Sequence, residues 1–192
     1  MEITLEQLLQ SRDNRQRTQQ RLLKAFPSCT LMCMTVIMPG KIKRNKQSLT
    51  IAKEAIKSLE QTFPKCIYAN NIDIFRKQSS EHKSVHFELD LETGFESYWL
   101  VDEKEKQCKL KACEIEDKHP LGRLFDIDII TREGIPLSRE SLGLRPRKCL
   151  ICDKPARLCM RTHAHTYQEI QEFIDKLVRN YPTTPSVISQ FP

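Results

Sequence analysis

Two acidic residues stand two positions apart in an apolar stretch, Leu124 to Thr131, that predicts a strand. Because side chains alternate along a strand, Asp126 and Asp128 point to one face and their apolar neighbours to the other. Carboxylates this close repel each other unless a cation lies between them. Magnesium (Mg²⁺) binds one or two carboxylates, keeps several waters and accepts phosphate oxygens. The pair predicts a magnesium site for phosphoryl transfer; the motif alone also fits a solvated acidic face.

Three residues just before the pair supply complementary chemistry. Gly122 permits close approach of the backbone to a ligand. Arg123 offers a planar fork to phosphate, and His119 accepts or donates a proton near neutral pH. Together they favour a catalytic site over a solvated surface.

A third carboxylate ligand is expected from the stretch Leu110 to Glu116, which we interpret as the preceding strand. Glu114 and Glu116 have the same two-residue spacing as the aspartates. If the two strands are neighbours, one of these glutamates reaches the metal, and we select Glu116.

A separate group of soft ligands lies near the C-terminus. Cys149, Cys152 and Cys159 are followed by His163 and His165. Three cysteines and one histidine can close a tetrahedral site for structural zinc (Zn²⁺), and we select His165 as the fourth ligand. Reduced, packed cysteines and redox chemistry are the alternatives.

The N-terminal segment predicts a helix, opened by the capping-box pattern Thr4 to Gln7 and free of Gly and Pro before Pro27. Arg12 and Arg15 lie near its apolar stripe. A cation on the inward side of a helix needs an anionic partner, so both are predicted to bind substrate. Alternatively the helix breaks near Ser11 and the arginines are solvated.

A short cationic loop follows a strand predicted over residues 29–38 and precedes a helical pattern over residues 48–63. Gly40 and Lys43 lie in this loop. Free N–H groups at a helix N-terminus, with lysines nearby, suit phosphate, so we include both residues among the substrate-binding candidates. An ordinary turn with solvated lysines is the alternative.

The remaining periodicities complete an α/β (α+β) fold: a mixed sheet flanked by helices. Alternation over residues 85–91, a turn at 92–94 and the run 95–101 predict two strands joined by a turn. Residues 102–107 read as a hairpin loop leading to the strand at 110–116, and a final helix follows the capping box that begins at Thr166. We expect residues 1–144 to form the catalytic domain. Residues 145–192 form the cysteine-rich knuckle and C-terminal helix, packed on that domain, with a loosely held tail from Pro182.

Composition limits the classes of protein. The chain of 192 residues carries a net charge of +6, which favours polyanionic partners. Its polar N-terminus lacks a secretion signal and no window approaches a membrane span, so we expect a cytoplasmic protein with no membrane partner. The other cysteines, in apolar runs, are expected to be reduced core residues.

These residues resemble a known family. The run His119 to Asp128, the pattern from Arg147 to Cys152 and the Cys159-Met160-Arg161 segment are similar to the apo-citrate lyase phosphoribosyl-dephospho-CoA transferases, also called citrate lyase holo-acyl-carrier-protein synthases. The segments Leu8 to Gln16 and Met38 to Lys43 extend the likeness over nearly the whole chain.

The resemblance implies a nucleotidyltransferase-like core and a definite reaction. Such enzymes move the phosphoribosyl-dephospho-CoA group of 2'-(5''-triphosphoribosyl)-3'-dephospho-CoA to a serine of the acyl carrier (gamma) subunit of citrate lyase, releasing diphosphate. Asp126 and Asp128 would hold magnesium, Arg123 and Lys43 would offset the charge of the leaving group, and His119 or Glu116 would take the serine proton.

Two other functions remain open from the sequence. Related synthases modify the malonate decarboxylase carrier protein, and the basic balance with a cysteine knuckle is also compatible with a non-enzymatic nucleic-acid-binding module. The second is disfavoured because aromatic residues make up only 7% and no basic stripe is interleaved with them. We therefore expect no nucleic-acid partner.

Overall fold

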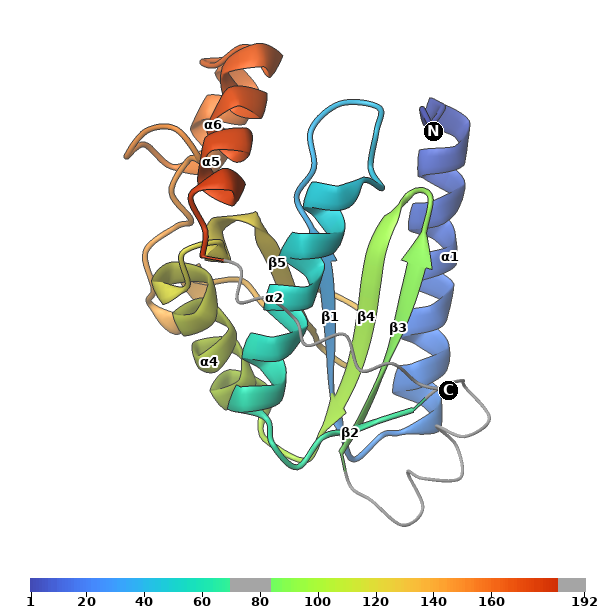
Figure 1. Cartoon of the computed structure of the whole chain (residues 1–192). Helices are drawn as coiled ribbons and strands as arrows, with labels where there is room; N and C mark the ends of the chain where they lie inside the picture. The colour runs from blue at the N-terminus through green and yellow to red at the C-terminus, as the bar shows by residue number, and fades with distance from the viewer. Residues whose placement is uncertain (70–83, 183–192) are drawn as a thin grey trace.

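The computed structural model describes residues 1–69 and 84–182 (Figure 1). Its centre is a five-stranded sheet in the order β2-β3-β4-β1-β5, in which β2 pairs with β3 in parallel and the other pairs are antiparallel. The mixed sheet flanked by helices confirms the predicted fold class. The strands are β1 Thr30–Val36, β2 Ile67–Tyr68, β3 Val85–Leu91, β4 Gly94–Val101 and β5 Phe125–Ile130.

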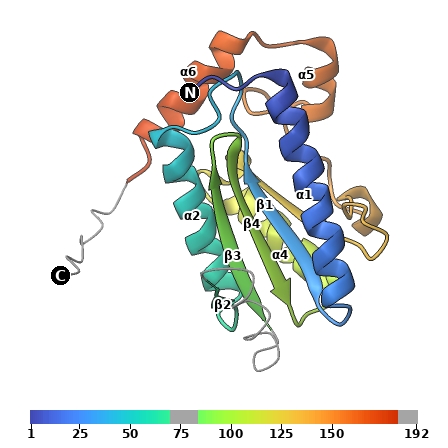
Figure 2. The same ribbon diagram turned by 90° about the vertical axis from the view of Figure 1, so that its right-hand side faces the viewer.

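Helices cover both faces of the sheet. Helix α1 lies on one face and α2 on the other, as Figure 2 shows, and α4 packs against β5. The helices are α1 Leu5–Ala25, α2 Lys46–Thr62, α4 Glu105–Lys118, α5 Ala156–Thr162 and α6 Tyr167–Arg179, with 3-10 turns η1 Gly122–Leu124 and η2 Glu140–Leu142.

Each face of the sheet has its own apolar cluster. The smaller cluster joins Leu22 of α1 to Leu31 and Cys33 of β1. The larger one lies between the sheet and α2, α4 and α6, and includes Trp99 and Ile174. Strand β1 is apolar on both faces because it lies inside the sheet between these clusters.

Several local predictions are confirmed. The capping boxes at Thr4 and Thr166 are both formed, and α1 continues without a break past Ser11. The predicted strands at 29–38, 85–91, 95–101 and 124–131 correspond to β1, β3, β4 and β5. Most of the C-terminal tail, from residue 183, lies outside the described residues, as do residues 70–83.

One element was predicted wrongly. Residues 110–116 are not a strand, and the predicted hairpin loop at 102–107 extends too far: α4 begins at Glu105 and contains residues 105–107 and 110–116. Its buried residues include Cys108, Ala112 and Ile115, a spacing of four and three that fits a helix face. Glu114 and Glu116 stand two positions apart, which is the spacing of a strand face. In α4 this spacing arises because charged residues flank the buried face of the helix on both sides.

No helix within residues 1–69 and 84–182 is long and apolar enough to cross a membrane.

Candidate active site

The acidic pair lies on the face of the sheet that α1 covers. In the antiparallel pairing of β1 with β5, Thr35 is opposite Asp126 and Cys33 is opposite Asp128. Directly opposed residues point to the same face, and Cys33 belongs to the apolar cluster beneath α1. The predicted shared orientation of the two aspartates is therefore confirmed.

A third carboxylate lies in the same cross-strand row. Glu96 of β4 is opposite Thr35, which in turn is opposite Asp126, so the three residues follow one another across three adjacent strands. Glu96 is only 3% exposed. Its carboxylate accepts hydrogen bonds from Arg15 Nε at 2.9 Å and from the Tyr98 hydroxyl at 2.6 Å. The site is thus a row of acidic side chains beneath α1.

Sequence reasoning missed Glu96, although it predicted that Arg15 needs an anion. The signal was present as a single charged residue in the otherwise apolar or uncharged run Phe95 to Val101. A buried charge of this kind requires a partner. Only the packing of α1 on β4 shows that Arg15 is that partner.

Asp128 is largely buried, beside the carboxylate of Asp126. Burial raises its pKa to about 6, and the charge of Asp126 adds to this rise, while Lys109 and Arg147 oppose it. Arg147 Nη1 lies 3.3 Å from Asp126 Oδ1, and Asp128 forms no ion pair within the described ranges. The side chain of Asp126 is 44% exposed. Two carboxylates side by side at an opening to solvent fit a magnesium ion that retains waters.

A basic cavity adjoins this pair. Its volume is about 480 Å³, and Arg147 belongs to its lining and also contacts Asp126. Arg123 lines it too, and the Nη2 atom of Arg123 is buried without a hydrogen-bond partner among the described residues. An anionic ligand would supply the missing acceptor. The cationic lining residues are Arg123, Arg139, Arg145, Arg147 and Lys148.

Glu116 lies close enough to the acidic pair for its charge to raise the pKa of Asp128, and it shares Arg147 with Asp126. It projects from α4 and is 3% exposed, and its carboxylate accepts from Arg139 Nη2 at 2.7 Å, from Arg147, and from the backbone N–H of Ile127 at 3.0 Å. Its oxygens are occupied in holding two arginines and the edge of β5. The alternative, Glu114, is exposed and pairs with Lys118.

His119 lies away from the aspartates. Its ring packs on Phe125 at 4.9 Å between centroids, and Phe125 belongs to the larger cluster, on the sheet face opposite Asp126. Its Nδ1 accepts from the backbone N–H of Leu121 at 3.0 Å, and its Nε2 lies 3.4 Å from the Tyr181 hydroxyl. These contacts hold the His119 ring at the end of α4, on the other face of the sheet from the aspartates.

Gly122 is required by packing. A Cβ atom at this position would lie 2.6 Å from the carbonyl oxygens of both Ile115 and Glu116. The turn that carries Arg123 can therefore lie against the end of α4 only because residue 122 has no side chain.

Lys43, in the loop after β1, lies near Arg12 of α1, and Arg12 itself is exposed. Burial lowers the pKa of Lys43, and the like charge of Arg12 lowers it further. Lys43 Nζ donates to the Met38 carbonyl. A Cβ at Gly94 would lie 3.9 Å from the Cβ of Lys43. Lys43 therefore lies beside the first residue of β4, two positions before Glu96.

Gly40 has a positive φ of 73°, and an added Cβ would meet the ring of Tyr167 at 2.6 Å. A glycine is therefore required at position 40 by the backbone conformation of the loop and by the contact with α6.

Comparison with known proteins decides the family. The family model described as "Apo-citrate lyase phosphoribosyl-dephospho-CoA transferase" matches residues 3–181. The chain belongs to this family. The predicted resemblance is confirmed, and with it the coarse assignment as a transferase concerned with the prosthetic group of citrate lyase.

Individual relatives agree with this membership. A "Probable apo-citrate lyase phosphoribosyl-dephospho-CoA transferase" of Streptococcus pyogenes serotype M18 is 32% identical over 185 residues, covering 93% of this chain and 87% of the relative. The "Apo-citrate lyase phosphoribosyl-dephospho-CoA transferase" of Escherichia coli O7:K1 is 31% identical over 178 residues, covering 93% of this chain and 90% of the relative. "Protein CitXG" of Haemophilus influenzae is 32% identical over 179 residues, but the chain spans only 36% of its length.

In this family member the C-terminal ligands form a compact cluster. One ligand atom from each of Cys149, Cys152, Cys159 and His165 lies within 4.8 Å of the others. His163 is exposed and does not belong to it. The structure therefore brings together the four ligands predicted for zinc.

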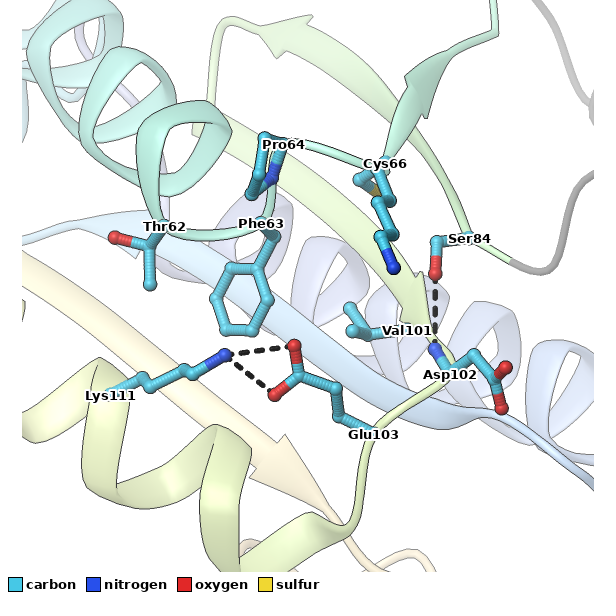
Figure 3. A pocket seen from close by; sticks show the side chains of 10 residues that line it. Thr62, Phe63, Pro64, Cys66, Ser84, Val101, Asp102, Glu103 and Lys111 are labelled. Atoms are coloured by element: carbon cyan, nitrogen blue, oxygen red, sulfur yellow. Dashed lines mark hydrogen bonds and ion pairs between the residues drawn. The ribbon is translucent and has the colours of Figure 1, made fainter.

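Another cavity, of about 590 Å³, lies near the ends of α2 and β4, away from the aspartates (Figure 3). Lys111 of this cavity donates to both carboxylate oxygens of Glu103, at 2.8 and 2.7 Å. Among the described residues no arginine lines this cavity, whereas four arginines line the basic cavity beside Asp126, so the basic cavity suits a polyanion better.

Proposed function

We propose that the chain transfers the phosphoribosyl-dephospho-CoA group from triphosphoribosyl-dephospho-CoA to a serine of the acyl carrier (gamma) subunit of citrate lyase, with release of diphosphate. The observation that carries the proposal is the contact between the acidic pair and the basic cavity through Arg147. Such a site can bind a metal and a polyphosphate side by side. Family membership supplies the chemical identity of the transferred group.

The basic cavity suits the leaving group. The proposed reaction forms a bond between the serine Oγ and the phosphorus nearest the ribose, and breaks the bond from that phosphorus to the diphosphate. Arg123, whose Nη2 has no acceptor among the described residues, would bind the departing diphosphate together with Arg147 and Lys148. The proton of the serine hydroxyl leaves to solvent.

The acidic row would position the reacting phosphate. Asp126 and Asp128 would hold magnesium, which when bound supplies positive charge to the phosphate oxygens and lowers the pKa of the attacking hydroxyl. Glu96 holds Arg15 on the α1 side of the row. Arg12 and Lys43, which lie near each other, would bind the diphosphate bridge within the dephospho-CoA part.

Recognition of the carrier would depend on charge. The net charge of +6 favours association with an acidic partner, because opposite charges steer diffusional encounter. We propose a catalytic unit over residues 1–144 of nucleotidyltransferase type, acting in the cytoplasm, with residues 145–192 packed on it.

The test is a transfer assay with an acidic-pair variant. Purified protein is incubated with triphosphoribosyl-dephospho-CoA, magnesium and the apo-carrier, and the carrier is weighed by intact mass spectrometry. We expect a mass gain equal to the phosphoribosyl-dephospho-CoA group. The Asp126→Asn/Asp128→Asn variant should lose about a hundredfold or more in rate, as expected when charge stabilisation at a transferring group is removed.

Asp13→Asn is the matched control, because Asp13 is an exposed aspartate of α1 and its loss should leave the rate unchanged. No mass gain with folded protein and competent substrate would overturn the assignment of the carrier, and the malonate decarboxylase carrier would then be tested. A gain that survives the double substitution would remove the acidic pair from the mechanism.

A further inference from the structure

The region between the basic cavity and α6 contains little apolar core of its own. Residues 145–165 comprise a short loop structure and the seven-residue helix α5, on which Leu158 is 42% and Met160 is 74% exposed. Short segments without a sufficient core are commonly stabilised by a metal or by disulfides. The eight cysteines of the described ranges are all free thiols.

Four potential ligands converge in this region from three separate places. Cys149 and Cys152 lie in the loop before α5, Cys159 lies in α5 itself, and His165 precedes the N-cap of α6. Their ligand atoms lie within 4.8 Å of one another, and Cys152 Sγ is 3.6 Å from Cys159 Sγ. Ligands about 2.0 to 2.3 Å from a tetrahedral zinc ion are separated by roughly 3.5 to 3.8 Å. The Cys152–Cys159 distance matches such a site, and the other ligand atoms lie close to this separation.

The backbone holds these ligands in place. The N–H of Cys149 donates to the carbonyl of Lys154 and the N–H of Ala156 to that of Arg147, which closes the loop around the first two cysteines. These two backbone hydrogen bonds fix the relative positions of Cys149 and Cys152.

The histidine supplies independent evidence. His165 Nε2 is buried and has no hydrogen-bond partner within the described residues. A buried imidazole nitrogen without a partner is costly unless it is bound to something else. His163, two residues earlier, adopts a left-handed conformation with φ of 47°, which ends α5 and returns the chain so that His165 reaches the cysteines.

We propose that Cys149, Cys152, Cys159 and His165 bind one zinc ion in a closed, structural site. Four protein ligands leave no position for substrate, so the ion would stabilise the fold instead of taking part in transfer. Its consequence for the reaction is indirect. Arg147 and Lys148 immediately precede Cys149, so the bound ion would hold the cationic edge of the basic cavity against Asp126.

A disulfide is the main competitor. Cys152 Sγ and Cys159 Sγ are 3.6 Å apart, whereas a disulfide requires about 2.05 Å. Two measurements distinguish zinc from a disulfide. A chelator acts only on the metal site, and only a disulfide gives the denatured chain a mass below that of the fully reduced chain.

The first experiment measures bound metal on the full chain without a polyhistidine tag, purified under reducing conditions from zinc-supplemented medium. Elemental analysis is expected to find about one zinc per chain. His165→Asn should lower the zinc content severalfold, and His163→Asn is the matched control, since asparagine tolerates the left-handed conformation. Equal zinc in the two variants, or a wild-type protein that binds none, would overturn the proposal.

The second experiment needs no variant and so does not depend on one folding. Native protein is alkylated before and after treatment with a chelator, and modified cysteines are identified by peptide mass. Cys149, Cys152 and Cys159 should be protected until the metal is removed. Cobalt added to the stripped protein should produce the thiolate charge-transfer and intense visible bands of a tetrahedral site. Unprotected cysteines, an oxidised pair, or the absence of these bands would contradict a zinc site.

Discussion

At the scale of single residues, the two faces of β5 carry different kinds of side chain: the acidic pair lies on one face and core residues lie on the other. Asp126 and Asp128 point beneath α1, whereas Phe125 and the ring of His119 lie in or against the larger apolar cluster. His119 is close to the acidic pair along the chain, which is why sequence reasoning nominated it. In the folded protein it contacts Tyr181, whose hydroxyl donates to Glu54 of α2.

We therefore expect His119→Ala to reduce stability and to leave the chemistry intact. Loss of ring packing and of the acceptor for the Leu121 N–H should cost about 1–3 kcal/mol of unfolding free energy. The transfer rate, measured well below the unfolding midpoint, should change by about twofold or less. A general base would cost about 10² to 10⁴ in rate, so a fall of that size would restore His119 to the mechanism.

At the scale of elements, α4 and the turn that follows it determine where β5 begins. β5 is an outer strand of the sheet, so its outer backbone groups have no neighbouring strand in the described part of the chain. Side chains of α4 bind them instead: Glu116 accepts from the Ile127 N–H, and Lys109 Nζ lies 3.4 Å from the Ile127 carbonyl. Close packing of Gly122 against the end of α4 completes this arrangement and directs Arg123 to the basic cavity.

Gly122→Ala should consequently destabilise the protein by about 3 kcal/mol, because the new Cβ would overlap backbone oxygens that cannot move independently. Gly143→Ala is the control: that glycine has a φ of 70° but no atom within 4 Å of an added Cβ, so its cost should be about 1 kcal/mol of backbone strain. Urea unfolding of both variants measures the difference. Equal costs would show that the contact with α4 relaxes easily.

At the scale of the whole molecule, α6 is part of the main core. Ile174 is fully buried in the larger cluster, and Gln47 of α2 donates to Asp175 at 2.7 Å. Residues on α6 therefore stabilise the same core as Trp99 of β4, the only tryptophan of the chain. We infer that the C-terminal region and the sheet unfold together.

Replacing Ile174 with Ala tests this coupling. A cavity at a fully buried site should lower the free energy of unfolding by about 2–5 kcal/mol. If the molecule is one cooperative unit, Trp99 fluorescence and far-ultraviolet circular dichroism should shift to the same lower midpoint. Met160→Ala, at an exposed position of α5, should shift neither probe. An unchanged Trp99 transition in Ile174→Ala would separate the two regions.

The sequence by itself determined features that depend on near neighbours in the chain. Strand alternation placed Asp126 and Asp128 on one face, capping boxes located the starts of α1 and α6, and cysteine spacing identified the C-terminal cluster. The run His119 to Asp128 carried the family resemblance that the comparisons confirmed. Local geometry suffices for such features because backbone periodicity fixes the relation of residues a few positions apart.

Only the tertiary structure decided which distant residues share a surface. Glu96 joins the acidic row because β4 and β5 both pair with β1, and Glu116 faces two arginines because residues 105–118 form a helix instead of a strand. His165 rather than His163 reaches the cysteines because the chain turns between them. Strand order, helix packing and chain reversal arise from burial of both faces of the sheet, and no short sequence pattern encodes them.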